Sequence, residues 1–156
     1  MAKLLNIAIC DDEKVQVELL EKYVNSWAKL NNKKITIGKF YTGDAFHFDW
    51  CVDKKFEILL LDIEMPGING VELARKIREE DEFINIIFIT ALTDFIGEGY
   101  DVSAINYLIK PIKEEKLHEC LDRAKQKIPE EENWILIDED EEIIRIKEKD
   151  ILYIES

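Results

Sequence analysis

Five short apolar segments recur along the first 128 residues, separated by polar or amphipathic stretches. Nearly continuous apolar runs of this length are typical of strands buried on both faces of a parallel sheet. The segment at 35–40 instead alternates apolar and polar residues, a pattern that also predicts a strand. The predicted strands are residues 4–10, 35–40, 56–61, 84–89 and 104–109.

Between these segments, apolar residues recur at spacings of three and four, which predicts amphipathic helices. The helix predicted from Asp94 is weak, because Gly97 and Gly99 interrupt it and glycine disfavours a helix. The predicted helices begin near Val15, after a cap at Thr42 or Asp44, near Val71, at Asp94 and near Leu117.

The alternation of strands and helices predicts an α/β fold, a doubly wound parallel sheet with helices on both faces. In such sheets, functional groups collect beyond the C-terminal ends of the strands. One polar residue there would be a helix cap or a solvated surface group. A whole set at one edge of the sheet predicts a site instead. That set is Asp11, Asp12, Asp62, Thr90 and Lys110.

The three carboxylates of this set would repel one another and resist ionisation unless a cation lies among them. Their oxygen atoms suit Mg²⁺, which keeps several waters and takes one or two carboxylates directly. A metal there would attract a phosphoryl donor, and Asp62 would act as the nucleophile that forms an aspartyl phosphate. Lys110 would supply a cation, and Thr90 a hydroxyl donor, to the phosphoryl oxygens.

Four motifs at the predicted strand ends match one known family. They are Cys10-Asp11-Asp12-Glu13, Leu59-Leu60-Leu61-Asp62-Ile63-Glu64-Met65-Pro66-Gly67, Ile89-Thr90-Ala91 and Tyr107-Leu108-Ile109-Lys110-Pro111. With them, residues 4–128 resemble the response-regulator receiver family. The resemblance implies a flavodoxin-like five-stranded sheet with strand order 2-1-3-4-5. It also implies a phosphoacceptor rather than an enzyme, which receives its phosphoryl group from a sensor histidine kinase.

The resemblance further assigns roles to single residues. Lys110 precedes Pro111. In the family the peptide bond between these two residues is cis, which directs the lysine into the site. Thr90 and Tyr107 are expected to act as a switch pair, although Tyr107 is equally well interpreted as a half-buried strand aromatic. The implied Mg²⁺ ligands are Asp11, Asp12, Asp62 and the backbone carbonyl of Glu64.

Two further consequences of phosphorylation are predicted, the first from the resemblance and the second from the weak helix at Gly97 and Gly99. Glu64 and Leu92 stand at the positions by which the family tunes autodephosphorylation. Since an apolar Leu92 cannot hold an attacking water by a hydrogen bond, slow autodephosphorylation is predicted. We also expect phosphorylation to reshape residues 91–110 and to promote a homodimer through that face and the last helix.

The composition limits the partners. With 34 acidic and 21 basic residues, the formal net charge is −13, which opposes non-specific binding to DNA or anionic membranes. No apolar run approaches the roughly 20 residues that cross a bilayer, and the start of the chain shows no cleavable signal pattern. A cytoplasmic protein is therefore expected.

The three cysteines include no Cys-x-x-Cys pair, the two histidines lie far apart in sequence, and a structural role is expected for most of these residues. Cys10 and Cys120 are predicted to be buried, inert thiols. Cys51 has no evident place in the predicted core. His47 and His118 are expected to face solvent or cap helices rather than to bind a metal.

The last 28 residues are a different kind of sequence, with 11 acidic and 3 basic side chains. After the receiver at 1–128 and a linker at 129–133, two strands and the start of a third are predicted around an acidic turn. The sequence of residues 150–155 resembles the N-terminal part of the LytTR DNA-binding domain. Residues 134–156 are therefore interpreted as the N-terminal fragment of such a domain, in a truncated transcription regulator whose DNA contacts lie further downstream.

Two alternatives stay open. The tail can also be an acidic β-appendage on a stand-alone receiver that acts through protein–protein contacts. A phosphatase with an aspartyl intermediate is disfavoured, because the related dehalogenase-type phosphatases resemble a pattern with a second Asp where this chain has Glu64.

Overall fold

The computed structural model describes residues 4–92, 102–128, 134–139 and 142–147. Its contacts divide the chain into two units, one of which comprises Leu4–Ile128. The weak helix predicted from Asp94 and the third strand predicted in the tail lie outside the described residues.

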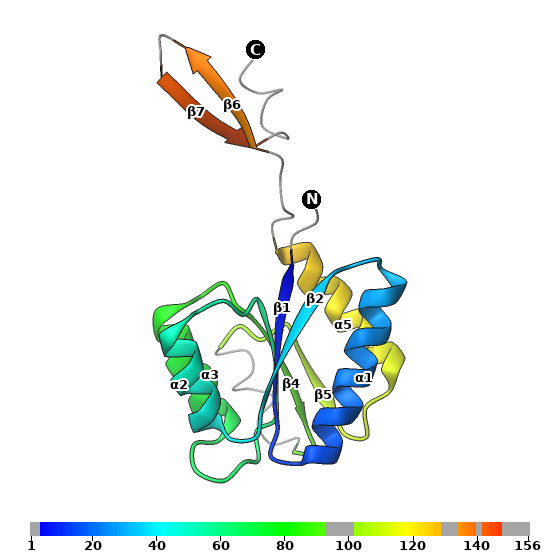
Figure 1. Ribbon diagram of the computed structural model, residues 1–156. Coiled ribbons are helices and arrows are strands. Elements are labelled where there is room, and N and C mark those ends of the chain that lie inside the picture. The colour runs from blue at the N-terminus through cyan, green and yellow to red at the C-terminus, as the bar shows by residue number, and fades with distance from the viewer. Residues whose placement is uncertain (1–3, 93–101, 129–133, 140–141, 148–156) are drawn as a thin grey trace. The chain divides into compact units, whose positions relative to one another are not determined.

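A five-stranded parallel sheet forms the centre of the larger unit, with strand order β2-β1-β3-β4-β5 (Figure 1). The predicted doubly wound α/β fold and its strand order are confirmed. The strands are β1 (Leu5–Cys10), β2 (Ile35–Phe40), β3 (Ile58–Leu61), β4 (Asn85–Thr90) and β5 (Asn106–Ile109).

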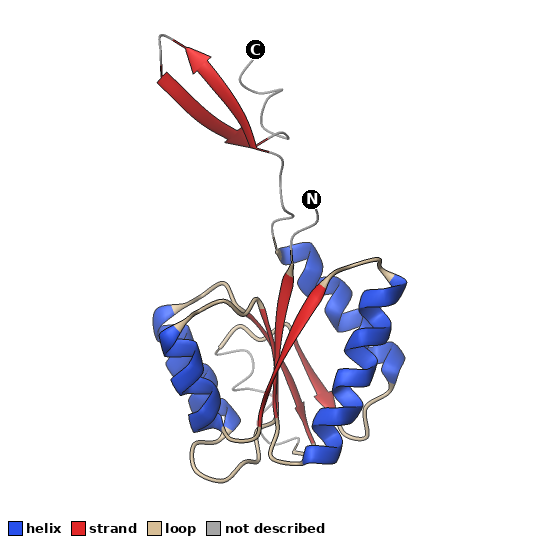
Figure 2. Cartoon of the chain, viewed as in Figure 1, coloured by secondary structure: helices blue, strands red, loops and turns tan. Residues whose placement is uncertain are grey.

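Of the helices in the described residues, α1 and α5 cover one face of the sheet and α2 and α3 cover the other, as Figures 1 and 2 show. They begin and end close to the predicted positions. Thr42 rather than Asp44 caps α2, since its hydroxyl accepts a hydrogen bond from the Ala45 amide at 3.0 Å. The helices are α1 (Lys14–Leu30), α2 (Gly43–Val52), α3 (Gly70–Glu80) and α5 (Glu114–Lys127).

Each central strand contributes side chains to two hydrophobic cores, one on each face of the sheet, because successive side chains point to opposite faces. In β1, Ile7 and Ile9 pack beneath α1 and α5, whereas Ala8 and Cys10 pack beneath α2 and α3. The same alternation holds in β3 and β4, all of whose residues are buried. Burial on both faces explains why these strands read as continuous apolar runs.

Two strands, β3 and β5, begin two residues later than predicted. The Glu57 amide donates to the Asn6 carbonyl, but the β3 ladder starts one residue further on, at Ile58. Before β5, Ser103 adopts a positive φ of 55°, and the chain leaves this turn only in time for the strand to start at Asn106. Apolar character alone does not mark where a turn ends.

The tail forms an antiparallel pair of strands, β6 (Trp134–Glu139) and β7 (Glu142–Lys147). Both were predicted from two apolar runs joined by an acidic turn, although each strand is two residues longer than its run. Their register pairs Trp134 with Lys147 and Glu139 with Glu142.

Candidate functional site

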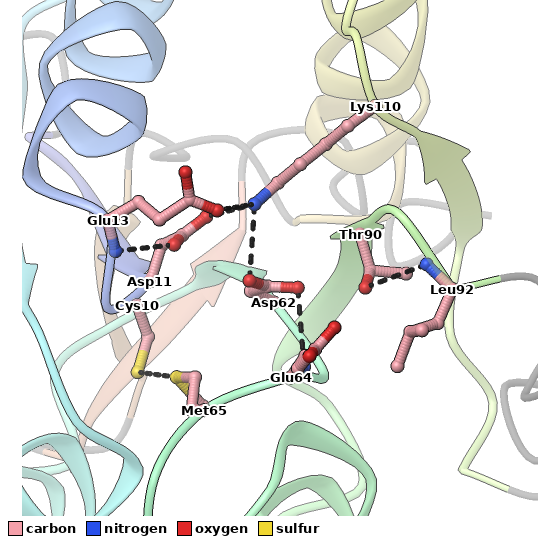
Figure 3. A network of polar contacts seen from close by, with 9 residues as sticks. All are labelled: Cys10, Asp11, Glu13, Asp62, Glu64, Met65, Thr90, Leu92 and Lys110. Carbon is pink, nitrogen blue, oxygen red and sulfur yellow. Dashed lines mark hydrogen bonds and ion pairs between the residues drawn. The ribbon is translucent and has the colours of Figure 1, made fainter.

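The predicted site residues stand at the carboxyl edge of the sheet, as the topology requires. Asp11 follows β1, Asp62 follows β3, Thr90 is the last residue of β4 and Lys110 follows β5. Figure 3 shows the Lys110 side chain reaching Asp11 and Asp62, with Thr90 beside them and joined to Leu92. Four strands that are distant in sequence thus supply one polar cluster.

Lys110 joins the acidic residues of this cluster. Its Nζ donates to Asp11 Oδ2 at 2.9 Å and to Asp62 Oδ2 at 3.2 Å, and lies 3.5 Å from Glu13 Oε1. Asp11 is 1 % exposed and Asp62 is 4 % exposed, so the ammonium pairs with two carboxylates that have lost most of their water. The peptide bond between Lys110 and Pro111 is cis, as expected.

Four carboxylates share the site with that single ammonium. Oxygens of Asp11, Asp12, Glu13 and Asp62 all lie within 4.8 Å of one another. The prediction did not include Glu13 among the ligands, although the acidic triplet at 11–13 is a usable signal. Glu13 enters the cluster because its amide donates to Asp11 Oδ1 at 2.9 Å, which folds the chain back over the site. Hard oxygen donors at this density fit a divalent cation such as Mg²⁺.

The pKa values reflect this crowding. Burial raises the pKa of Asp11 from 3.8 to about 6, and repulsion by Asp62 adds to the effect of burial, against the lowering effect of the Lys110 and Glu13 hydrogen bonds. For Lys110, burial lowers the pKa, but the hydrogen bond to Asp11 and the charges of Asp62 and Asp11 outweigh it, so that the pKa is raised. Lys110 therefore stays protonated. Its single positive charge does not offset the burial of Asp11 and the repulsion by Asp62, so the pKa of Asp11 stays above its ordinary value.

The backbone fixes Asp62 at the end of β3. Its amide donates to the Cys10 carbonyl at 3.0 Å, and the Glu64 amide donates to Asp62 Oδ1 at 3.4 Å. A Cβ at position 70 would lie 2.2 Å from the Asp62 carbonyl oxygen, so only glycine fits at the start of α3. Gly67, with φ +77°, turns the chain between them.

Thr90 and Tyr107 meet at the backbone of Leu92 rather than at the carboxylates. The Leu92 amide donates to Thr90 Oγ1 at 3.3 Å, and the Tyr107 hydroxyl donates to the Leu92 carbonyl. Among the described residues, the Thr90 hydroxyl forms no hydrogen bond with Asp62 or Lys110, although the Lys110 amide donates to the Thr90 carbonyl at 2.9 Å. Tyr107 is half-buried and its ring lies 5.8 Å from that of Phe88. The two predicted switch residues are thus linked through one peptide segment.

Cys10 closes the floor of the site. It is fully buried, and its Sγ lies 3.7 Å from Met65 Sδ and 3.4 Å from the Thr42 carbonyl. Burial raises the pKa of this thiol to about 12, and the charges of Asp11, Asp62 and Asp12 add to the shift. The predicted burial of Cys10 is confirmed, and a thiol this hard to ionise is expected to be a poor nucleophile.

Comparisons with known proteins agree with this geometry. Residues 7–122 match the family model of the response regulator receiver domain, and the chain belongs to that family. Over 122 residues it is 33% identical to the positive alginate biosynthesis regulatory protein of Pseudomonas aeruginosa, covering 78% of this chain and 48% of that protein. It is 26% identical to the sensory transduction protein LytT of Bacillus subtilis, covering 96% of this chain and 64% of that protein.

A solved structure shows the same architecture. The response regulatory domain of protein mrkE from Klebsiella pneumoniae matches with a TM-score of 0.69 at 25% identity, covering 78% of this chain and 96% of that one. The chain spans about half to two thirds of the length of the two relatives named above. In the described part of the chain, the helices are too short or too polar to cross a membrane.

Proposed function

We propose that the chain is a phosphoacceptor: a sensor histidine kinase transfers a phosphoryl group to Asp62 with the help of Mg²⁺. The observation that carries the proposal is the setting of Asp62. It is buried at a strand end, 3.2 Å from the Lys110 ammonium and within 4.8 Å of three other carboxylates. A carboxylate on the surface is not usually placed in such an environment, whereas a carboxylate nucleophile that works with a bound metal is.

The residues of the chain divide the work. An Asp62 oxygen forms the new bond to phosphorus as the bond to the donor nitrogen breaks. Lys110 exchanges part of its contact with Asp62 for a phosphoryl oxygen, and the Thr90 hydroxyl donates to another. Asp11, Asp12, Asp62 and the Glu64 carbonyl would hold Mg²⁺, with Glu13 nearby, and a bound ion would supply neutralisation of the charge on the phosphoryl oxygens.

The output is proposed to be transcriptional. In this proposal residues 129–133 are a linker and residues 134–156 are the first strands of a LytTR-type DNA-binding domain whose remainder lies downstream. The names of the relatives support a regulatory role. The net charge of −13 opposes DNA binding by this chain itself. Phosphorylation would act through Thr90, Tyr107 and the Leu92 segment to promote a homodimer in the cytoplasm.

Incubation with Mg²⁺ and acetyl phosphate, followed by mass spectrometry, tests the phosphoacceptor. One phosphoryl group should be added to the chain, and Asp62→Ala should abolish the addition because the nucleophile is gone. Asp49→Ala, an acidic residue on α2, is the matched control and should be modified like the wild type. Steady release of phosphate with no accumulating modification would instead indicate a phosphatase. Equal sedimentation of the phosphorylated and unmodified samples would exclude the homodimer.

Slow autodephosphorylation is the second expectation. Leu92 packs its apolar side chain against the core beneath α2 and α3, while its backbone bonds Thr90 and Tyr107. Leu92→Glu should shorten the half-life of the phosphorylated protein several-fold, since a carboxylate can hold the attacking water. The control Leu92→Met keeps an apolar side chain and should leave the half-life unchanged. A wild-type half-life equal to or shorter than that of Leu92→Glu would contradict this expectation.

A further inference from the structure

A second group of metal-ligating side chains lies on the α2–α3 face, away from the acidic cluster. His47 and Cys51 stand one turn apart on α2, and Glu80 is the last residue of α3. One ligand atom from each lies within 4.8 Å of the others. Figure 1 shows the two helices side by side on one face of the sheet. The full group could not be predicted from the sequence, because Glu80 is far along the chain from the other two and lies on a different helix.

We propose that His47, Cys51 and Glu80 form a binding site for Zn²⁺. The imidazole Nε2 of His47 lies 3.6 Å from Cys51 Sγ. Zinc bonds of about 2.3 Å to sulfur and about 2.1 Å to nitrogen at a tetrahedral angle place the two ligand atoms about 3.6 Å apart. The helical i, i+4 spacing thus presents this pair at the separation that a zinc ion spans.

The ring of His47 has a packing partner before any ion binds, and Cys51 is accessible. The His47 ring packs against the indole of Trp50, with centroids 6.1 Å apart, and Trp50 is fully buried. Cys51 is exposed, whereas Cys10 and Cys120 are both buried. Burial raises the pKa of each of those two buried thiols. Cys51 is therefore the accessible thiol of the chain.

Glu80 would be the third ligand, and binding the ion would cost it only a weak ion pair. Its carboxylate pairs with the Lys54 ammonium at 3.5 Å, but both side chains are about half exposed, so this ion pair contributes little. Rotation of an exposed carboxylate away from Lys54 brings an oxygen onto the ion. Lys54 then keeps its second contact, 4.9 Å above the Trp50 ring. Because Cys51 and Glu80 are both exposed, a water would supply the fourth ligand.

The donor set separates this site from the acidic cluster. Thiolate and imidazole select zinc and similar transition metals, whereas the four carboxylates at the strand ends suit Mg²⁺. A bound ion would fasten the C-terminal end of α3 to α2. The N-terminal end of α3 begins at Gly70, directly against the Asp62 backbone. Zinc would therefore stiffen the helix on which the phosphoacceptor rests.

Cobalt is a suitable probe, because a thiolate ligand gives Co²⁺ a charge-transfer absorption that carboxylates do not. We expect the full chain, titrated with Co²⁺ in excess Mg²⁺, to bind one equivalent with this absorption, and Zn²⁺ to displace it. Cys51→Ser should abolish the band, and His47→Ala should weaken binding tenfold or more. Glu80→Gln should weaken binding several-fold. Lys54→Gln should tighten it, since Glu80 is released and a positive charge removed.

Two controls separate this site from the proposed function. His118→Ala removes the other histidine, and Asp62→Asn disables phosphoacceptance; both should keep the cobalt band and the zinc affinity of the wild type. A missing band at micromolar to millimolar Co²⁺, or a band that survives Cys51→Ser, would overturn the site. Equal affinities in Glu80→Gln, Lys54→Gln and the wild type would overturn the assignment of Glu80.

Discussion

Replacement of Lys110 by methionine is expected to lower the free energy of unfolding of the metal-free protein by about 3 kcal/mol at neutral pH. Methionine keeps the length and apolar stem of the side chain but removes the ammonium that bonds Asp11 and Asp62. Removing one partner of a buried ion pair is costly because the remaining charge keeps its desolvation and loses its attraction. Urea denaturation in EDTA measures the loss.

The matched control is Lys39→Met. Lys39 pairs with Glu21 at 3.3 Å, but their side chains are 40% and 32% exposed, so its loss should cost under about 0.5 kcal/mol. Mg²⁺ should restore part of the stability of Lys110→Met, since a divalent cation also neutralises the carboxylates, and should do nothing for Lys39→Met. If the two variants lose the same stability in EDTA, the Lys110 network contributes no more than a surface pair.

This network was largely predictable from the sequence, for a topological reason. In a parallel sheet all C-terminal strand ends meet at one edge, so the polar residues that follow the apolar runs must gather there. Asp11, Asp62 and Lys110 could be placed in this way without any knowledge of turns. Their mutual contacts, 2.9 Å and 3.2 Å from Lys110, bear out the placement.

Features that depend on loop geometry were not predictable. Glu13 joins the cluster because its own amide bonds Asp11, a turn that the apolar pattern does not encode. The link between Thr90 and Tyr107 passes through backbone atoms of Leu92, which no side-chain pattern specifies.

The α2–α3 contact shows the same limit. Helical periodicity indicates which face of α2 is buried, but the partner of that helix follows from the handedness and length of the connections. Cys51 therefore had no evident role in the sequence, although it stands one helical turn from His47. Glu80 joins this pair only through the packing of α3 beside α2, as Figure 1 shows.

The raised pKa of Asp11 gives a second large effect, of opposite sign to that of Lys110→Met. A carboxyl whose pKa rises to about 6 on folding contributes stability below its ordinary pKa near 3.8, and this contribution is lost as the pH rises through 6. At pH 7.5 the ionised Asp11 therefore lowers the free energy of unfolding of the metal-free protein. Asp11→Asn should raise the free energy of unfolding there by about 2 kcal/mol, allowing for some screening where the site opens to solvent.

The pH dependence distinguishes this cause from a simple packing gain. The advantage of Asp11→Asn over the wild type should fall toward zero at pH 4, where the native carboxyl is already protonated, while all other groups titrate alike in both proteins. Saturating Mg²⁺ at pH 7.5 should reverse the order, because the ionised carboxylate then gains a cation that asparagine binds poorly. Urea unfolding at pH 4, 5.5 and 7.5 gives the comparison. An advantage that stays constant with pH would show that the charge of Asp11 is not its source.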